Sequence, residues 1–195
     1  MSNRHRDLEQ RLERTEQELR LFQKISRFMV RDLSLQEVLR GIVDLVVEFM
    51  KCDSCLVYLI DKDRLVLCAS NRERSDALGK LSLKLDEGLT GWVARERRLL
   101  AISREAYTDP RFKYFKDLPE DTYEAFLSAP VIARNRVVGV INVQHRAAHS
   151  HTGSELEMIT TVGEQVGCVL MLARLASTGI QDMNHAELVF ASGRP

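Results

Sequence analysis

Apolar residues near the N-terminus recur at the alternating four- and three-residue spacing of a heptad repeat. The a and d positions of this seam hold Leu8, Leu12, Thr15, Leu19, Phe22, Ser26 and Met29. Flanking charges of opposite sign, Arg4 before Glu9 and Arg11 before Glu16, would face each other between two parallel chains. The pattern predicts that residues 1–33 form a coiled-coil helix that makes the protein a homodimer, with the helices that start at Ser34 and Thr152 packed at the same dimer interface. The alternative is an amphipathic helix that folds back on its own domain.

Two further helices are marked by capping boxes, in which a Ser or Thr and a Glu three residues later satisfy free N–H groups. Ser34 with Glu37 predicts a helix that starts there and runs to about Met50, with a wide apolar face. Thr152 with Glu155 predicts a helix to about residue 176 that is also apolar along one side. We therefore expect both helices to pack on a core.

Between these helices, short runs rich in Val, Leu and Ile alternate with charged turns, as in an antiparallel sheet. The predicted strands cover residues 54–60, 64–70, 80–85, 99–102, 125–133 and 137–144. A glycine-bracketed loop at 87–91 opens a short helix at 92–95, and residues 103–122 form a long irregular connection with room for one helical turn. The pattern therefore predicts an α+β domain over 34–176, followed by a loosely held tail at 177–195.

Composition and charge narrow the class of protein. Hydrophobic residues make up 45% and charged residues 29% of the chain, close to globular averages. The 28 Lys and Arg residues balance 28 Asp and Glu residues, so we expect no nucleic-acid partner. Residues 1–20 lack the apolar run of a signal peptide, and no segment approaches the roughly 20 apolar residues of a membrane span, so we expect a cytoplasmic protein without membrane contact. Four unevenly spaced cysteines predict reduced thiols.

Four segments, in this order along the chain, match the motifs of one family. They are Asp86-Glu87-Gly88-Leu89-Thr90-Gly91-Trp92-Val93-Ala94, Asp109-Pro110-Arg111-Phe112, Ser128-Ala129-Pro130-Val131 and Val138-Gly139-Val140-Ile141-Asn142-Val143. With them the chain resembles the GAF domain, a regulatory fold related to PAS domains, over about residues 21–175. It is similar to the GAF domains placed ahead of bacterial signalling and phosphotransferase modules. The resemblance implies an antiparallel sheet with the terminal helices on one face and the loops and short helix on the other.

The same resemblance implies a non-catalytic small-molecule sensor in signal transduction, with a signalling protein as partner. Its ligand would lie between the sheet and the loops. The pocket residues would be Cys68, Ser70, Trp92, Tyr107, Asp109, Arg111, Phe115, Glu124, Ser128 and Gln144. Aromatic groups and charges of both signs suit a small molecule, but they name neither the ligand nor a cofactor, which stays unknown. For each residue the alternative is core packing or a solvated loop charge.

Cysteines and histidines offer other chemistry. Cys52-Asp53-Ser54-Cys55 has the spacing of a redox or zinc pair, but a zinc site needs two more ligands, so packing is favoured and no metal site is predicted. His149-Ser150-His151-Thr152 directly precedes a capping box and is typical of a solvated loop. Only Cys68 suits a free methionine sulfoxide reductase, an enzyme that resembles this fold and that requires a second thiol near the pocket.

The sequence lacks the motifs of two GAF subtypes, and one alternative to a sensor remains. The motif of cyclic-nucleotide-binding GAF domains and the chromophore-cysteine segment of phytochromes are both missing, so we expect neither a cyclic nucleotide nor a bilin. The remaining alternative to a sensor is a dimerisation scaffold that binds nothing. Its pocket would be closed by its own Trp92, Tyr107 and Phe115.

Overall fold

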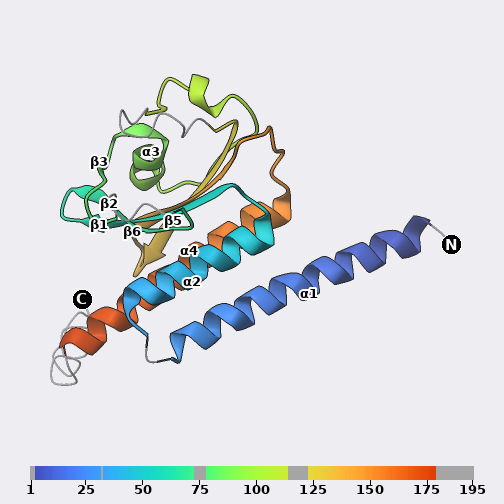
Figure 1. Ribbon diagram of the computed structural model, residues 1–195, viewed down its shortest axis with the longest axis horizontal. Coiled ribbons are helices and arrows are strands. Elements are labelled where there is room, and N and C mark those ends of the chain that lie inside the picture. The colour runs from blue at the N-terminus through green and yellow to red at the C-terminus, as the bar shows by residue number, and fades with distance from the viewer. Residues whose placement is uncertain (1–2, 32, 73–77, 114–122, 179–195) are drawn as a thin grey trace, which may run out of the picture.

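The computed structural model describes residues 3–31, 33–72, 78–113 and 123–178, in which helices and strands follow the predicted order (Figure 1). The helices are α1 (Asn3–Met29), α2 (Leu35–Met50), α3 (Gly88–Glu96) and α4 (Gly153–Thr178), with one 3₁₀ turn, η1 (Ala106–Thr108). The strands are β1 (Ser54–Asp61), β2 (Arg64–Ser70), β3 (Ser82–Lys84), β4 (Leu100–Ile102), β5 (Ala125–Ala133) and β6 (Arg136–His145). The predicted α+β class is confirmed.

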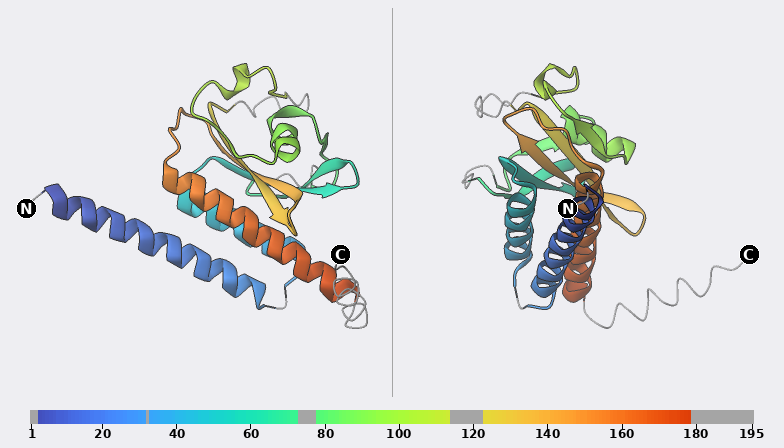
Figure 2. Two further views of the ribbon diagram at one scale, coloured as in Figure 1. Left: turned by 180° about the vertical axis from the view of Figure 1, so that it is seen from behind. Right: turned by 90° about the vertical axis from the view of Figure 1, so that its right-hand side faces the viewer.

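All six strands belong to one antiparallel sheet of order β3-β2-β1-β6-β5-β4. Helices α2 and α4 lie side by side on one face, and α1 lies outside them, while α3 and the long loops cover the opposite face (Figures 1 and 2). This is the layer arrangement that the resemblance implied. The sheet therefore separates a large apolar cluster under α2 and α4 from two smaller ones on the side of α3 and η1.

Local hydrogen bonds explain where the two core helices begin. The Ser34 hydroxyl accepts a hydrogen bond from the backbone N–H of Glu37 at 3.3 Å, and a Glu37 carboxylate oxygen accepts one from the Ser34 N–H at 2.8 Å. Thr152 and Glu155 make the same reciprocal pair at 3.3 and 2.6 Å ahead of α4. Each pair satisfies N–H groups that have no partner inside the helix, so both predicted starts are confirmed.

Two glycines let α4 lie directly on β5. A Cβ at Gly163 would come within 2.9 Å of the Pro130 carbonyl oxygen, and one at Gly167 within 2.2 Å of the Ile132 carbonyl oxygen. Only hydrogen fits at those two positions, so the helix backbone contacts the strand backbone without intervening side chains. The consequence is a close and fixed seat for α4 on the sheet.

Helix α4 also qualifies on length and composition as a membrane span, over Gly153–Ala173. The expectation that no segment approaches a span missed this stretch. Its apolar residues Met158, Ile159, Val162 and Val166 are buried in the core under the sheet. A soluble core helix passes the same test, so the finding carries little weight as an indication of a membrane.

Helix α1 divides into two halves. Leu21 and Ile25 are buried against the domain, and the Phe28 ring lies on Gly41 of α2, where a Cβ would meet it at 2.9 Å. Leu21, Ile25 and Phe28 are not a or d positions of the predicted heptad seam. They lie on the face of α1 that packs against the domain. The N-terminal half extends past both helices (Figure 1), where Leu8, Leu12 and Leu19 are 55%, 63% and 56% exposed. The C-terminal half thus folds back on its domain, and the coiled coil stays a prediction.

Three predicted boundaries shift. The short helix expected at 92–95 begins earlier, at Gly88. Gly88 has a positive φ of 71°, a conformation that glycine adopts readily and that allows the chain to turn from the loop into the helix. Strand 80–85 narrows to Ser82–Lys84, and strand 99–102 begins at Leu100. Within the connection 103–122, η1 supplies the expected helical turn, and residues 114–122 lie outside the described part of the chain.

Candidate functional site

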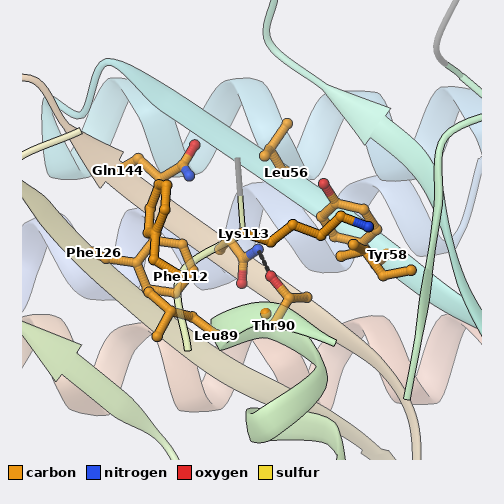
Figure 3. A pocket seen from close by; sticks show the side chains of 11 residues that line it. Leu56, Tyr58, Leu89, Thr90, Phe112, Lys113, Phe126 and Gln144 are labelled. Atoms are coloured by element: carbon orange, nitrogen blue, oxygen red, sulfur yellow. Dashed lines mark hydrogen bonds between the residues drawn. The ribbon is translucent and has the colours of Figure 1, made fainter. Parts of the chain in front are cut away.

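A small cavity lies between the sheet and α3, on the face opposite α2 and α4 (Figure 3). Its volume is about 50 Å³, which holds a few water molecules but no drug-sized ligand. Its walls come from β1, β3, β5, β6, the start of α3 and the segment after η1. The lining residues are Leu56, Tyr58, Leu83, Gly88, Leu89, Thr90, Phe112, Lys113, Phe126, Asn142 and Gln144.

A buried polar chain crosses the cavity floor from β5 to α3. The Ser128 hydroxyl donates to Asn142 Oδ1 at 2.6 Å, and Asn142 Nδ2 donates to the Thr90 hydroxyl at 2.8 Å. Figure 3 shows the second of these bonds as a dashed line. All three side chains are at least nine-tenths buried, where a hydrogen bond is strong and its loss is costly. The chain therefore fixes the orientation of the Asn142 amide in the wall.

Gln144 is the cavity residue whose bonding is incomplete. Its side chain is 8% exposed, and within the described ranges its Oε1 atom has no hydrogen-bond partner. Leaving a buried carbonyl oxygen unpaired costs about 1–3 kcal/mol. Figure 3 places the Gln144 amide beside Phe112, across the cavity from Tyr58. An acceptor of this kind, fixed in a cavity wall, is suited to an N–H or O–H group of a bound molecule.

Phe112 and Lys113, here called the cover, follow η1 and line the cavity. The Lys113 ammonium pairs with the Glu87 carboxylate at the start of α3, and that carboxylate also accepts from the Lys84 N–H at 3.1 Å. The hydrogen bond from Lys113 is the main reason that the pKa of Glu87 lies below its usual value. Gly88 gives the cover room, since a Cβ there would approach the Lys113 Cβ to 3.3 Å. The ion pair between Lys113 and Glu87 thus links the cover to the start of α3.

Of the residues implied by the resemblance, Gln144 lines the cavity and Ser128 stands one hydrogen bond behind it. Asp109, Arg111 and Trp92 form a separate cluster next to the cover. Arg111 donates two hydrogen bonds to the Asp109 carboxylate, at 2.9 and 2.7 Å, and its guanidinium lies 4.7 Å from the Trp92 ring centre. The Arg111 hydrogen bond lowers the pKa of Asp109. This cluster braces the residue that follows it, Phe112, rather than lining the cavity.

Four other residues of that set lie away from the cavity wall. Glu124 accepts a hydrogen bond from the Glu105 N–H at 3.0 Å, and Tyr107 is half-buried in η1. The buried Ser70 hydroxyl accepts from the Arg72 N–H at 3.1 Å. Cys68 packs against the core under α2, on the other face of the sheet. Phe115 lies outside the described residues.

Most lining residues were not among those implied. Leu56, Tyr58 and Asn142 carry the signal of strand alternation, because they share one face with Gln144 across the β1–β6 pairing. Gly88, Leu89, Thr90 and Phe112 lie inside two of the quoted motifs. The alternation is visible in the sequence. Which of the two faces lines the pocket depends on the register of strand pairing, and this register cannot be derived from the sequence alone.

The thiols of the chain are unsuited to catalysis at this cavity. Burial raises the pKa of Cys52 to about 12 and that of Cys55 well above the usual value, so both are protonated at neutral pH. Both lie in the core under α2 and α4, and burial also raises the pKa of Cys68. In the part of the chain that the structure describes, the cavity lining includes no cysteine.

Comparison with known proteins gives a consistent result. A sequence model of the GAF domain matches residues 34–170. The phosphoenolpyruvate-dependent phosphotransferase system protein of Escherichia coli is 30% identical over 145 residues, which make up 73% of this chain and 19% of that protein. The Nif-specific regulatory protein of Azospirillum lipoferum is 24% identical over 172 residues, 85% of this chain and 27% of that protein. The chain therefore spans less than a third of either curated relative.

A solved structure agrees with these sequence matches. The crystal structure of the GAF domain from an Acinetobacter phosphoenolpyruvate-protein phosphotransferase has a TM-score of 0.71 at 27% identity. The match covers 89% of this chain and 96% of that one. The similarity thus extends over nearly the whole of that solved domain.

Proposed function

Because the chain belongs to the GAF domain family, we propose that it is a small-molecule sensor module of bacterial signal transduction that acts as a regulatory domain and not as an enzyme. Its relatives include a phosphoenolpyruvate-dependent phosphotransferase system protein and a Nif-specific regulatory protein, and the second name denotes regulation. We place its ligand in the cavity between the sheet and α3. Cytoplasmic location and a signalling protein as partner remain predictions that follow from the same family.

The observation that carries this proposal is the unpaired Gln144 Oε1 atom in a largely apolar cavity wall, beside a buried chain of hydrogen-bonded side chains. Two buried hydrogen bonds, from Ser128 to Asn142 and from Asn142 to Thr90, hold the Asn142 amide in one orientation. A packed core without a ligand gains more from apolar side chains at such positions. The arrangement therefore supports a small polar ligand that donates a hydrogen bond to Gln144 and sets its apolar part against Phe112 and Phe126.

Binding requires that the cover move, because about 50 Å³ does not hold such a molecule. The ion pair between Lys113 and Glu87 is one contact that opening must break. A ligand that binds the open form shifts the population toward it by its difference in affinity for the two forms. Since Glu87 caps α3 and Thr90 of α3 bonds to Asn142 of β6, the change reaches the sheet through α3.

We further propose that the module is a homodimer through the N-terminal half of α1, and that α1, α2 and α4 carry the signal out of the domain. Exposed leucines at heptad spacing, Leu8, Leu12 and Leu19, support this assignment. Helix α1 packs on α2 through Leu21 and Ile25, so a movement of α2 is passed to the exposed seam. A ligand bound at the sheet would thus alter the relation between two chains.

Native mass spectrometry of gently purified, untagged protein tests both parts at once. We expect the mass of a dimer together with a retained small molecule, which is then identified and added back to ligand-free protein. Hydrogen exchange should slow at residues 88–96 and 112–113 when it is added. A monomer would refute the dimer, and unchanged exchange around the cavity on saturation would refute the sensor site.

The small cavity favours one second candidate, a dimerisation scaffold that binds no ligand. In that case apolar side chains close the space, as Phe112 and Phe126 do in part. Trp92 and Tyr107, which sequence reasoning gave this role, do not line the cavity. A dimer that carries no small molecule and whose unfolding temperature responds to no member of a metabolite library would favour the scaffold. The reductase alternative finds no support in the positions of Cys52, Cys55 and Cys68.

A further inference from the structure

Three histidines meet at the end of β6, outside the cavity. His145 is the last residue of β6, and His149 and His151 follow in the loop that leads to α4. One candidate ligand atom from each of the three lies within 4.8 Å of the others. The His145 and His149 rings are stacked with centres 4.1 Å apart, and the His151 ring lies 5.0 Å from that of His149. The loop reverses the chain and so gathers the three imidazoles.

Two of these rings hold buried nitrogen atoms that lack hydrogen-bond partners. His145 is 6% exposed, and among the residues that the structure describes its Nε2 atom has no partner. Both ring nitrogens of His151 are likewise buried and lack a partner within the same part of the chain. Each such nitrogen costs free energy when it is left unpaired, so the cluster as it stands is incompletely satisfied.

The third histidine, His149, is hydrogen-bonded to the Glu155 carboxylate. His149 Nε2 lies 2.8 Å from Glu155 Oε1, and the other oxygen of Glu155 accepts from the Thr152 N–H at 2.6 Å. The His149 backbone N–H donates to the Ser103 carbonyl at 2.9 Å, which ties the loop to the chain that follows β4. A carboxylate on one ring nitrogen fixes the ring and its tautomer, and it leaves Nδ1 as the free electron-pair donor.

The environment of His145 and His151 favours the neutral form of these two rings. Burial, followed by the neighbouring His149 and His151, lowers the pKa of His145 to about 4. Burial and His149 also lower the pKa of His151, and they outweigh the opposite effects of Glu155 and the Ile102 carbonyl. A neutral imidazole is the form that binds metals. At neutral pH the two buried rings therefore need not lose a proton before they coordinate an ion.

We propose that His145, His149 and His151 form a binding site for a divalent transition-metal ion of the zinc type, with Glu155 as the residue that orients His149. Three imidazoles and one open position are a donor set that Zn²⁺ accepts. In a tetrahedral site with Zn–N bonds of about 2.0–2.1 Å, two ligand nitrogens stand about 3.4 Å apart. The observed limit of 4.8 Å thus requires the most distant pair of nitrogens to approach by at most about 1.4 Å.

Such an ion would link the sheet to α4. His145 immediately follows Gln144, the cavity residue with the unpaired oxygen, and Glu155 lies in the first turn of α4. Side chains of adjacent strand residues point to opposite faces, so the metal site and the cavity are separate sites on one strand. The ion would clamp the loop between them. Loss of the metal would loosen the start of α4 and leave the cavity wall intact.

Metal titration of the untagged full chain tests the proposal. The protein is stripped with a chelator and titrated with Zn²⁺ by calorimetry, and then with Co²⁺, whose visible spectrum reports the ligands. We expect one ion per chain, a tetrahedral Co²⁺ spectrum without sulfur charge-transfer bands, and a higher unfolding temperature with Zn²⁺. Sulfur bands would assign the ion to Cys52 and Cys55 and overturn the proposal. So would an absence of tight binding.

Variants separate coordination from folding. His149→Gln and His151→Gln should abolish tight Zn²⁺ binding while keeping the circular dichroism of the parent. Glu155→Gln keeps the capping box, since Gln also serves there, but should weaken Zn²⁺ binding roughly 10- to 100-fold by removing the carboxylate behind His149. His5→Gln, on the exposed surface of α1, is the matched control and should bind as the parent does. Equal affinity in all four variants would show that Zn²⁺ binds elsewhere.

Discussion

Replacing Gln144 by leucine gives the sharpest test of the cavity as a ligand site. The side chain is nine-tenths buried, and in the described part of the chain its Oε1 atom is unpaired. Leucine has nearly the same volume and no polar atom. If the amide serves only a ligand, the Gln144→Leu variant without ligand should be more stable than the parent, because the cost of the unpaired oxygen disappears.

The magnitude follows from that cost. An unpaired buried acceptor costs about 1–3 kcal/mol, and we take the lower end of this range. We therefore expect the free energy of unfolding to rise by about 1 kcal/mol. For a domain of this size that corresponds to an unfolding temperature about 2–4 °C higher. The small molecule retained by the parent should at the same time be absent from the variant.

Thermal unfolding followed by circular dichroism, with and without added ligand, measures both quantities. Gln23→Leu, on the exposed face of α1, is the control, and it should leave stability and ligand response unchanged. If Gln144→Leu lowers stability by about 1 kcal/mol or more, the amide is bonded in the native protein and the reasoning is refuted. If the variant is stabilised but keeps its ligand, the site lies elsewhere.

Three other changes test separate parts of the structure. Leu12→Lys should turn the dimer into a monomer in sedimentation without lowering the unfolding temperature, because Leu12 is exposed on its own chain; a persistent dimer would place the interface elsewhere. Gly167→Ala should destabilise the protein by about 1–3 kcal/mol in denaturant unfolding, since its Cβ would lie 2.2 Å from the Ile132 carbonyl oxygen, whereas unchanged stability would show that α4 can shift. Because Arg111 lowers the pKa of Asp109, this pair stabilises the fold above the ordinary carboxyl pKa and loses its effect as the pH falls through the lowered value. In Arg111→Gln, carboxyl NMR titration should find the pKa of Asp109 closer to its ordinary value, and an unchanged pKa would contradict the ion pair.

The sequence predicted the elements that depend on near neighbours. Both capping boxes are complete within four residues, so Ser34 and Thr152 mark their helices correctly. The start of α3 was placed too late, because the positive φ of Gly88 depends on how the loop meets Lys113, a contact across 25 residues. Short-range chemistry is visible in a sequence, and contacts between distant segments are not.

The candidate site was predicted in its motifs but not in its lining. Gln144 and Ser128 belong to it, whereas Cys68 faces the helices, because β1 and β2 shift register between Val57 and Tyr58. Such a bulge turns a strand residue to the other face and leaves no local signal. The histidine cluster escaped for a related reason. In the sequence, His149 and His151 are typical of a solvated loop. In the fold, the buried His145 ring lies beside both of them.

The close seat of α4 on β5 has a mechanical consequence. Gly163 and Gly167 bring the helix backbone closest to the sheet, so a rigid rotation of α4 would turn about this contact. At 1.5 Å per residue, the part of α4 from Gly163 back to Gly153 is about 15 Å long, and the part from Gly167 to Thr178 is about 17 Å long. Because the two parts are nearly equal in length, such a rotation would move the two ends of α4 in opposite directions by similar amounts.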